Sequence, residues 1–228
     1  MAVLLYHSEL TVMGLNIFRA GFLGVDIFFV ISGYVITLSF ISAKSTYLGF
    51  LKRRAARLYP AFLFVLLVSS VAALFCMGLE SYREFAQTVV YALFHVVNFN
   101  FALGDPYWGV QSIFKPILHF WSLSVEWQFY LLTPLFLRFL TKSNWAFHIV
   151  FITAISLIGL IVVDDRYSYL TFYGPHFRFW EYLAGSFVAL LHSRTEFGKT
   201  KFGLQLIGLL GLLVSFAVIT QVSHPSWN

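Results

Sequence analysis

The sequence predicts an all-α fold: one membrane-embedded domain over residues 1–228, built as a polytopic bundle of about seven or eight transmembrane helices. Charged residues make up 11% of the chain, hydrophobic residues 59% and aromatic residues 20%, whereas a soluble domain contains about 25% charged residues. The mean hydropathy of +0.79 agrees with this composition. Several apolar segments also approach the roughly 20 residues that a helix needs to cross a bilayer.

The predicted spans follow one another with short polar connections. The first is barely long enough and is interrupted by His7. The third opens beside Pro60, because proline suits the first turn of a helix, and the fourth contains His95 and Asn98. In order, the predicted spans are Met1–Phe18, Phe22–Ile41, Leu58–Leu79, Phe85–Leu103, His119–Leu140, Trp145–Val163, Phe172–Leu191 and Phe202–Val222.

The positive charges predict the orientation of the spans. The cluster Lys52–Arg57 places the connection between the second and third spans in the cytoplasm, since Lys and Arg are enriched in cytoplasmic loops. If every segment crossed once, the later cations would lie on the opposite side. One change of parity between Glu80 and His119 removes the conflict, so we expect Phe85–Pro116 to contain a re-entrant or otherwise irregular piece.

Several classes of function are disfavoured by composition. The net charge of +5 is explained by cations in short loops, so it does not indicate a nucleic-acid partner. A single cysteine, Cys76, allows neither a disulfide framework nor a cysteine-based metal site. The seven histidines are scattered, and we predict no metal site. Met1–Leu5 lacks a basic region, so a cleavable signal peptide of the usual form is not expected.

Two ionisable residues near the start of the chain are candidates for chemistry, because such groups inside spans are energetically unfavourable and often functional. His7 can take or give a proton near neutral pH; alternatively, it is a core histidine bonded to a neighbouring helix. Asp26 stands close to the start of the second span, in the segment GFLGVDIFFVISGY. It could act in catalysis or could instead interact with the N-terminus of its own helix.

The basic cluster contains a candidate anion-binding pair. Arg54 and Arg57 are three residues apart and therefore share one face of a helix. Guanidinium groups bind phosphate in bidentate fashion, so the pair could hold a phosphorylated ligand. The alternative is that the cluster only sets orientation, which is the explanation we favour for Lys52 and Arg53.

A polar stripe runs along the predicted span that begins at His119. Its members are spaced by three or four residues, so they lie on one face of a helix, which faces either a wet cavity or an interhelical hydrogen-bond seam. The stripe consists of His119, Ser122, Glu126, Tyr130 and Thr133.

A further polar group occurs in PHFRFWEYLAG. Arg178 and Glu181 are spaced to neutralise each other, and Gly185 lies on the same face, where it allows close helix contact. We favour a structural role for this group.

Taken together, these segments resemble the acyltransferase 3 family of integral membrane acyltransferases, and the resemblance covers nearly the whole chain. GVDIFFVISGY and WSLSVE are its most specific motifs. The matching segments, in order, are Tyr6-His7, Gly21–Thr37, Phe50–Phe62, His119–Leu135 and Phe177–Leu191.

The resemblance implies transfer of an acyl group, often acetyl, from acetyl-CoA or another acyl-CoA to a hydroxyl of a surface carbohydrate such as lipopolysaccharide or exopolysaccharide. It implies that His7 is the catalytic residue, that Arg54 and Arg57 are needed for activity, and that the protein lies in the bacterial inner membrane. Arg54 and Arg57 would bind the coenzyme A phosphates. Glu126 or Asp26 would then orient His7 or hold the sugar.

The chain departs from the family pattern in several places. The usual arginine eleven residues before the histidine is absent, the family has about ten spans, and Trp127 replaces a common second glutamate. We therefore expect a copy truncated at both ends. Two other functions stay open: a transporter or exporter of a glycan or small molecule, which would also use intramembrane charges, and a catalytically inactive member.

Overall fold

The computed structural model describes residues 11–12, 15–16, 23–43, 46–103, 115–140, 145–162 and 168–194. Apart from two short strands, the elements within these ranges are helices, which agrees with the predicted all-α class. They are β1 (Thr11–Val12), β2 (Leu15–Asn16), α2 (Leu23–Ala43), α3 (Tyr47–Cys76), α4 (Leu79–Leu93), α5 (Val97–Leu103), α6 (Phe120–Leu140), α7 (Trp145–Val162), α8 (Ser168–Tyr173) and α9 (Pro175–Arg194).

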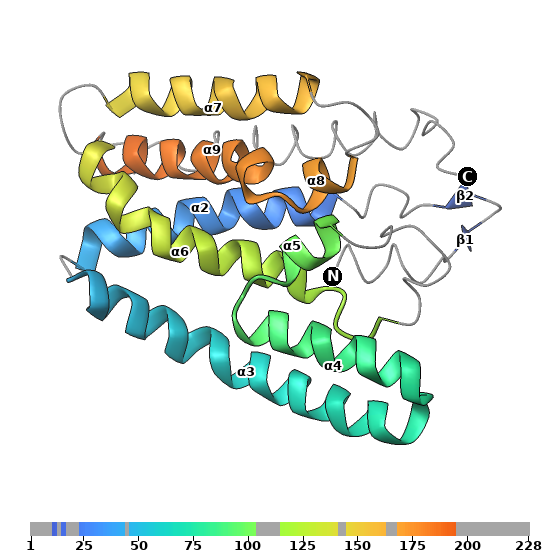
Figure 1. Cartoon of the computed structure of the whole chain (residues 1–228). Coiled ribbons are helices and arrows are strands. Elements are labelled where there is room, and N and C mark those ends of the chain that lie inside the picture. Colours follow the sequence, from blue (N-terminus) through green and yellow to red (C-terminus); the bar gives the residue numbers. More distant parts are fainter. Residues whose placement is uncertain are drawn as a thin grey trace.

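The helix α2 lies in the middle of the bundle. It packs against α9 on one side and against α6 on another, while α7 covers the outer side of α9 and α3 with α4 forms the opposite layer (Figure 1). Aromatic rings fill the junction of α2 and α6: the Phe29 ring lies 6.1 Å from Trp121 and 5.6 Å from Phe129, both edge-on. All three side chains are buried, so α2 is the element on which the neighbouring helices are assembled.

Two glycines allow α2 and α9 to approach backbone to backbone. A β-carbon added at Gly33 would overlap the carbonyl oxygen of Tyr182, and one added at Gly185 would overlap that of Val30. Beside the glycines, the Thr37 hydroxyl donates to Ser186 Oγ at 2.9 Å. The structural role predicted for Gly185 is thereby confirmed.

Replacing Gly185 with valine should lower the melting temperature of the detergent-solubilised protein, because the new side chain has to force α2 and α9 apart. Overpacking of this kind destabilises by about 1–3 kcal/mol. Gly78→Ala is the matched control, since a β-carbon at that position meets nothing within 4 Å. Equal melting temperatures for the two variants would show that the crossing tolerates a side chain.

The helix α3 begins earlier than the sequence suggested. It starts at Tyr47, where the Thr46 hydroxyl accepts a hydrogen bond from the Gly49 amide at 3.3 Å, and continues through Pro60. The prediction that Pro60 opens the helix is therefore wrong. With 30 residues, α3 is about 45 Å long. Its first turns carry the basic cluster, which lies on a helix and not in a loop.

Two predicted spans are each divided into two helices. Phe85–Leu103 is interrupted between α4 and α5 at residues 94–96, so the expected irregularity is present, although residues 104–114 lie outside the described ranges. Phe172–Leu191 is interrupted at Gly174, directly before Pro175 starts α9. Proline is favoured at the first position of a helix and cannot continue a preceding one, which explains this second break.

The first predicted span can be compared with the structure in part, and the last cannot. Where a helix was expected over Met1–Phe18, Thr11–Val12 and Leu15–Asn16 pair as antiparallel strands, so the helix prediction is wrong for these residues. The span predicted at Phe202–Val222 lies outside the described residues.

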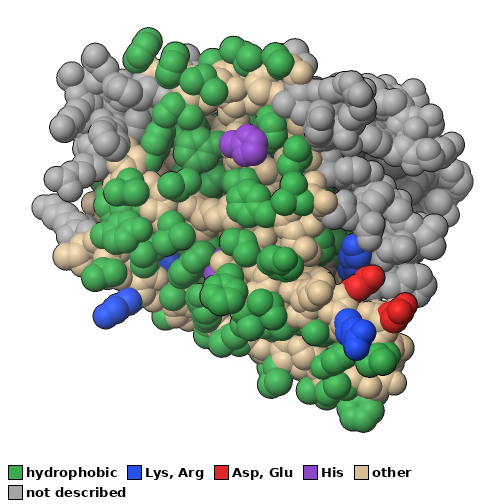
Figure 2. Space-filling view, in the orientation of Figure 1, with side chains coloured by type: hydrophobic (Ala, Val, Ile, Leu, Met, Phe, Trp, Pro, Cys, Tyr) green, Lys and Arg blue, Asp and Glu red, His purple; other side chains and the backbone are tan. Residues whose placement is uncertain are grey.

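Among the described helices, two are long and apolar enough to cross a membrane: Gly24–Ser42 within α2, and α3. The predicted seven or eight crossings stay a prediction. The outer surface of α3 is apolar, with Phe75 84% and Phe64 66% exposed. Figure 2 shows apolar side chains over much of the face drawn, with charged side chains towards its two ends, a distribution typical of a surface that meets lipid.

Candidate functional site

Arg54 is a buried cation near the start of α3. Its side chain is 7% exposed, and its guanidinium carbon lies 5.6 Å from the centre of the Phe50 ring and 5.8 Å from that of Tyr130. Cations are attracted to the faces of such rings. Arg57, one turn further, is exposed. The pair therefore has one member fixed in the bundle and one member free to reach a ligand from outside.

Glu126 on α6 lies beside this pair. Its Oε1 atom accepts hydrogen bonds from the Tyr130 hydroxyl at 2.6 Å and from the Ser32 hydroxyl of α2 at 3.2 Å. The carboxylate is buried and interacts electrostatically with both Arg54 and Arg57. A buried charge needs such partners. Glu126 thus joins α6 to α2 within the electrostatic field of the arginines on α3.

The C-terminal part of the polar stripe forms an interhelical hydrogen-bond seam. Thr133, also on α6, is hydrogen-bonded to the Tyr182 hydroxyl of α9, and both side chains are buried. Near the other end of the stripe, the Ser122 hydroxyl donates to the His119 carbonyl of its own chain segment at 3.1 Å. Glu126 and Thr133 thus bond to α2 and α9 respectively, which agrees with the seam alternative, whereas a wet cavity at the stripe stays a prediction.

Asp26 forms part of a separate charged group. Arg178 Nη1 lies 2.8 Å from Asp26 Oδ1 and 2.9 Å from Glu181 Oε1, and its Nε donates to the Phe172 carbonyl at 3.1 Å. The predicted pairing of Arg178 with Glu181 is confirmed. The sequence did not predict that Asp26, 152 residues away, shares the same guanidinium. This charged triad ties α2 to α9.

The two carboxylates proposed for chemistry meet α2 at different heights, because Asp26 is part of α2 whereas Glu126 of α6 is bonded to Ser32 of α2. Ser32, the α2 partner of Glu126, lies six residues beyond Asp26, which corresponds to a rise of about 9 Å. Glu126 accompanies Arg54 and Arg57, whereas Asp26 is held by Arg178. His7 lies outside the described residues, so its placement relative to both groups stays a prediction.

A buried histidine that was not among the predicted site residues lies close to the arginine end of α3. His95, between α4 and α5, is 3% exposed. Its Nε2 atom is 3.1 Å from the Tyr59 hydroxyl of α3, and its ring stacks on Trp127 of α6 with centroids 5.0 Å apart. The available signal was the presence of His95 and Asn98 inside an otherwise apolar predicted span.

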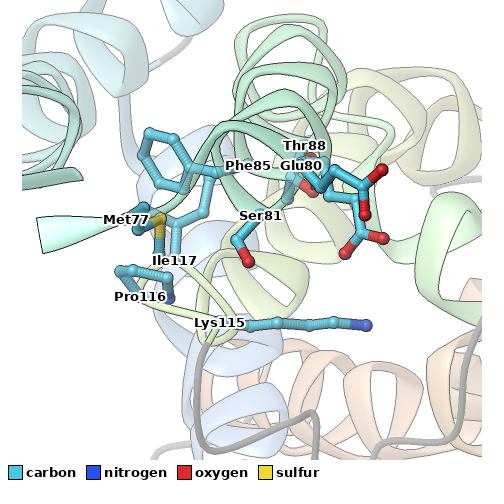
Figure 3. Close-up of a pocket in the computed structure, with 9 residues that line it drawn as sticks. Met77, Glu80, Ser81, Phe85, Thr88, Lys115, Pro116 and Ile117 are labelled. Atoms are coloured by element: carbon cyan, nitrogen blue, oxygen red, sulfur yellow. Dashed lines mark hydrogen bonds between the residues drawn. The ribbon is translucent and has the colours of Figure 1, made fainter. Parts of the chain in front are cut away.

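A cavity of about 300 Å³ opens at the far end of α3, where Met77 leads into α4. Met77 is 20 residues beyond Arg57, a distance of about 30 Å along a helix. Figure 3 shows Glu80, Ser81 and Lys115 among the residues that line it. The cavity and the arginines are therefore at opposite ends of one long helix. The complete lining is Met77, Glu80, Ser81, Glu84, Phe85, Thr88, Lys115, Pro116 and Ile117.

Comparison with known proteins identifies the family. The sequence profile of the acyltransferase 3 family, described as an acyltransferase domain, matches residues 1–228. The chain belongs to the acyltransferase 3 family. Membership makes it an acyltransferase, in agreement with the motifs around Asp26, Arg54 and Glu126, and the members of this family are membrane proteins.

Individual relatives extend this result. A protein of Haemophilus influenzae, described only as uncharacterised, is 30% identical over 203 residues, covering 83% of this chain and 82% of the relative. O-acetyltransferase OatA of Staphylococcus aureus is 36% identical over 169 residues, covering 71% of this chain. The matched region spans 27% of OatA. No solved structure matches the chain.

Proposed function

We propose that this acyltransferase 3 chain is a multi-pass protein of the bacterial plasma membrane that transfers an acetyl group from acetyl-CoA to a hydroxyl of a surface carbohydrate. The observation that carries the proposal is the buried Arg54 guanidinium, next to Arg57, on the first turns of a helix long enough to cross the membrane. The relatedness to a protein named O-acetyltransferase supports an oxygen acceptor.

The arginine end is suited to the donor. Coenzyme A carries several phosphates, and guanidinium groups bind phosphate through two parallel hydrogen bonds. Arg57 is exposed and can meet the ligand first, whereas Arg54 is already held by the Phe50 and Tyr130 rings and by the charge of Glu126. A pre-positioned cation loses little side-chain entropy when the phosphate binds.

The opposite end of α3 is suited to the acceptor. The cavity there offers carboxylates from Glu80 and Glu84, the Ser81 hydroxyl and the Lys115 ammonium group. Groups of these kinds form hydrogen bonds with sugar hydroxyls. If the cationic end of α3 is cytoplasmic, the cavity faces the side on which surface glycans are assembled.

The reaction requires a base for the acceptor hydroxyl. In our proposal His7 removes its proton as the hydroxyl oxygen attacks the thioester carbon, or else His7 carries the acyl group briefly. The C–S bond breaks and coenzyme A leaves as a thiolate, while an ester bond forms on the sugar. Glu126 orients the arginine end in this proposal, and Asp26 orients α2 through Arg178.

The test is an assay of ester-linked acetate on the surface glycans of cells that express the chain. We expect the unaltered chain to add acetate and His7→Ala to reduce the added acetate at least about tenfold, since general bases contribute about 10²–10⁴-fold to rate. Arg57→Ala should also reduce it at least about tenfold, because it removes a charge-assisted contact to phosphate. His192→Ala, which changes an exposed histidine on α9, is the control and should leave acetylation unchanged.

The other outcomes separate the competing functions. Full acetylation by His7→Ala would remove this residue from the mechanism. Altered glycan export with no added acetate would indicate a transporter, and no acetate with the unaltered chain would indicate an inactive member.

A further inference from the structure

His95 ends α4 in a conformation that usually requires glycine. Its φ is +54°, in the left-handed region. The Val96 amide donates to the Tyr91 carbonyl at 3.0 Å, and the His95 amide donates to that of Ala92 at 2.9 Å. This is the Schellman pattern of helix termination, in which glycine is favoured at the position that His95 occupies. A side chain retained in a strained backbone conformation suggests a function for that side chain.

The imidazole of His95 is held in place by side chains of α3 and α6. It stacks on Trp127 at 5.0 Å and lies 5.0 Å from the Phe62 ring, while Nε2 is 3.1 Å from the Tyr59 hydroxyl. The Gln128 side chain donates to the His95 carbonyl at 2.9 Å. Side chain and backbone are thus both held, so the ring has a single orientation.

One ring nitrogen is left without a partner. A phenol is more acidic than a neutral imidazole, and with Tyr59 as the donor to Nε2 the ring hydrogen lies on Nδ1. Nδ1 is buried and has no hydrogen-bond partner in the part of the chain that the structure describes. An unsatisfied buried donor is energetically unfavourable, and a ligand that carries an acceptor oxygen would satisfy it.

The aromatic side chains around His95 adjoin the proposed donor site. The Trp127 ring that stacks on His95 lies 5.8 Å from the Tyr130 ring, and the Tyr130 ring lies 5.8 Å from the guanidinium carbon of Arg54. Phe62 is five residues beyond Arg57, or about 7.5 Å along the helix axis. A thioester arm that extends from phosphates at the arginines into the bundle therefore runs toward His95.

We propose that His95 is a catalytic residue of the acyl-transfer site, whose Nδ1–H donates a hydrogen bond to the thioester carbonyl oxygen of acyl-CoA. The inference rests on the proposed function. As the acceptor oxygen bonds to the carbonyl carbon, its proton passes to His7 and negative charge collects on the carbonyl oxygen beside His95. The carbonyl then re-forms, the C–S bond breaks, and coenzyme A leaves as a thiolate. His95 stays neutral and transfers no proton.

The decisive variant is His95→Gly, because glycine suits the left-handed conformation and preserves the end of α4. We expect kcat for transfer of radiolabelled acetyl from acetyl-CoA to glycan in membrane vesicles to fall about a hundredfold, the usual effect of losing one oxyanion donor. The KM for acetyl-CoA should change little, and added imidazole should restore part of the activity. His192→Ala is the matched control, since it removes an exposed imidazole bonded to a tyrosine hydroxyl, that of Tyr34 at 3.1 Å.

A second variant keeps the inference testable if His95→Gly fails to fold. Tyr59→Phe removes the hydroxyl that fixes the ring hydrogen of His95 on Nδ1. We expect kcat to fall about tenfold, which corresponds to an activation free energy higher by about 1.4 kcal/mol. Unchanged kcat in either folded variant, even with a lower melting temperature, would show that His95 only packs, and would overturn this role alone. Absence of transfer by the unaltered chain would overturn the proposed function as well.

Discussion

Replacing Arg54 with alanine should lower kcat/KM for acetyl-CoA by at least about a hundredfold, because it removes the guanidinium that we propose binds a coenzyme A phosphate, together with a positive charge near buried Glu126. A hydrogen bond to a charged group contributes about 1.5–3 kcal/mol, guanidinium binds phosphate through two such bonds, and about 1.4 kcal/mol corresponds to a factor of ten. Arg54→Lys should restore little activity, since an ammonium group lacks the planar fork of guanidinium.

The measurement is a titration of acetyl-CoA at a fixed amount of glycan acceptor. Lys52→Gln provides the control, because Lys52 is an exposed cation on the same helix and should leave kcat/KM unchanged. Acetyl-dephospho-CoA, a donor with one phosphate fewer, should bind the unaltered chain more weakly than acetyl-CoA does. This difference in binding between the two donors should be smaller in Arg54→Ala. Wild-type kcat/KM in Arg54→Ala would exclude this residue from donor binding.

Replacing Arg178 with methionine should strongly destabilise the bundle. The substitution leaves the carboxylates of Asp26 and Glu181 without their shared counter-charge, and Glu181 already has one oxygen, Oε2, that is buried without a hydrogen-bond partner among the described residues. An uncompensated buried charge destabilises by about 3–5 kcal/mol. Thermal unfolding of the detergent-solubilised protein should show a markedly lower melting temperature.

Two further variants test the cause of this effect. Arg83→Met removes an exposed arginine of α4 and should have little influence on unfolding. Adding Asp26→Asn and Glu181→Gln to Arg178→Met should recover much of the lost stability, because no charge is then left unpaired. If this triple variant folds but transfers no acetate, at least one charge of the triad acts in the chemistry in addition to its structural pairing.

The helix pattern was predictable where hydrophobicity alone decides it. The predicted spans His119–Leu140 and Trp145–Val163 differ from α6 and α7 by one residue each, since polar residues follow each span in the sequence, at 141–144 and 164–166. The start of α3 was not predictable from Pro60, because the hydrogen-bonding turn at Thr46 and favourable packing of Phe50 and Arg54 extend the helix past it. Local signals identify a possible boundary, whereas tertiary contacts decide whether it is used.

The sequence predicted which residue types belong to the candidate site better than it predicted which of them contact one another. Arg54 and Glu126 were selected because charges inside apolar segments need a reason to be there. Their common neighbourhood, and the sharing of Arg178 by Asp26 and Glu181, depend on how distant helices meet, which spacing along one helix does not reveal. His95 was missed because its significance lies in a backbone angle and an unpaired nitrogen, neither of which is visible in the sequence.

The ion pair between Asp26 and Arg178 also determines when the protein can be completed during synthesis. The two residues are 152 positions apart, so at about 5–20 residues per second the ribosome needs roughly 8–30 s to deliver the arginine after the aspartate. Throughout this interval α2 lacks both the cation and the glycine-containing surface of α9. A nascent chain arrested before residue 178 should therefore depend on the insertion machinery to shield α2, and should be an early target for membrane proteases.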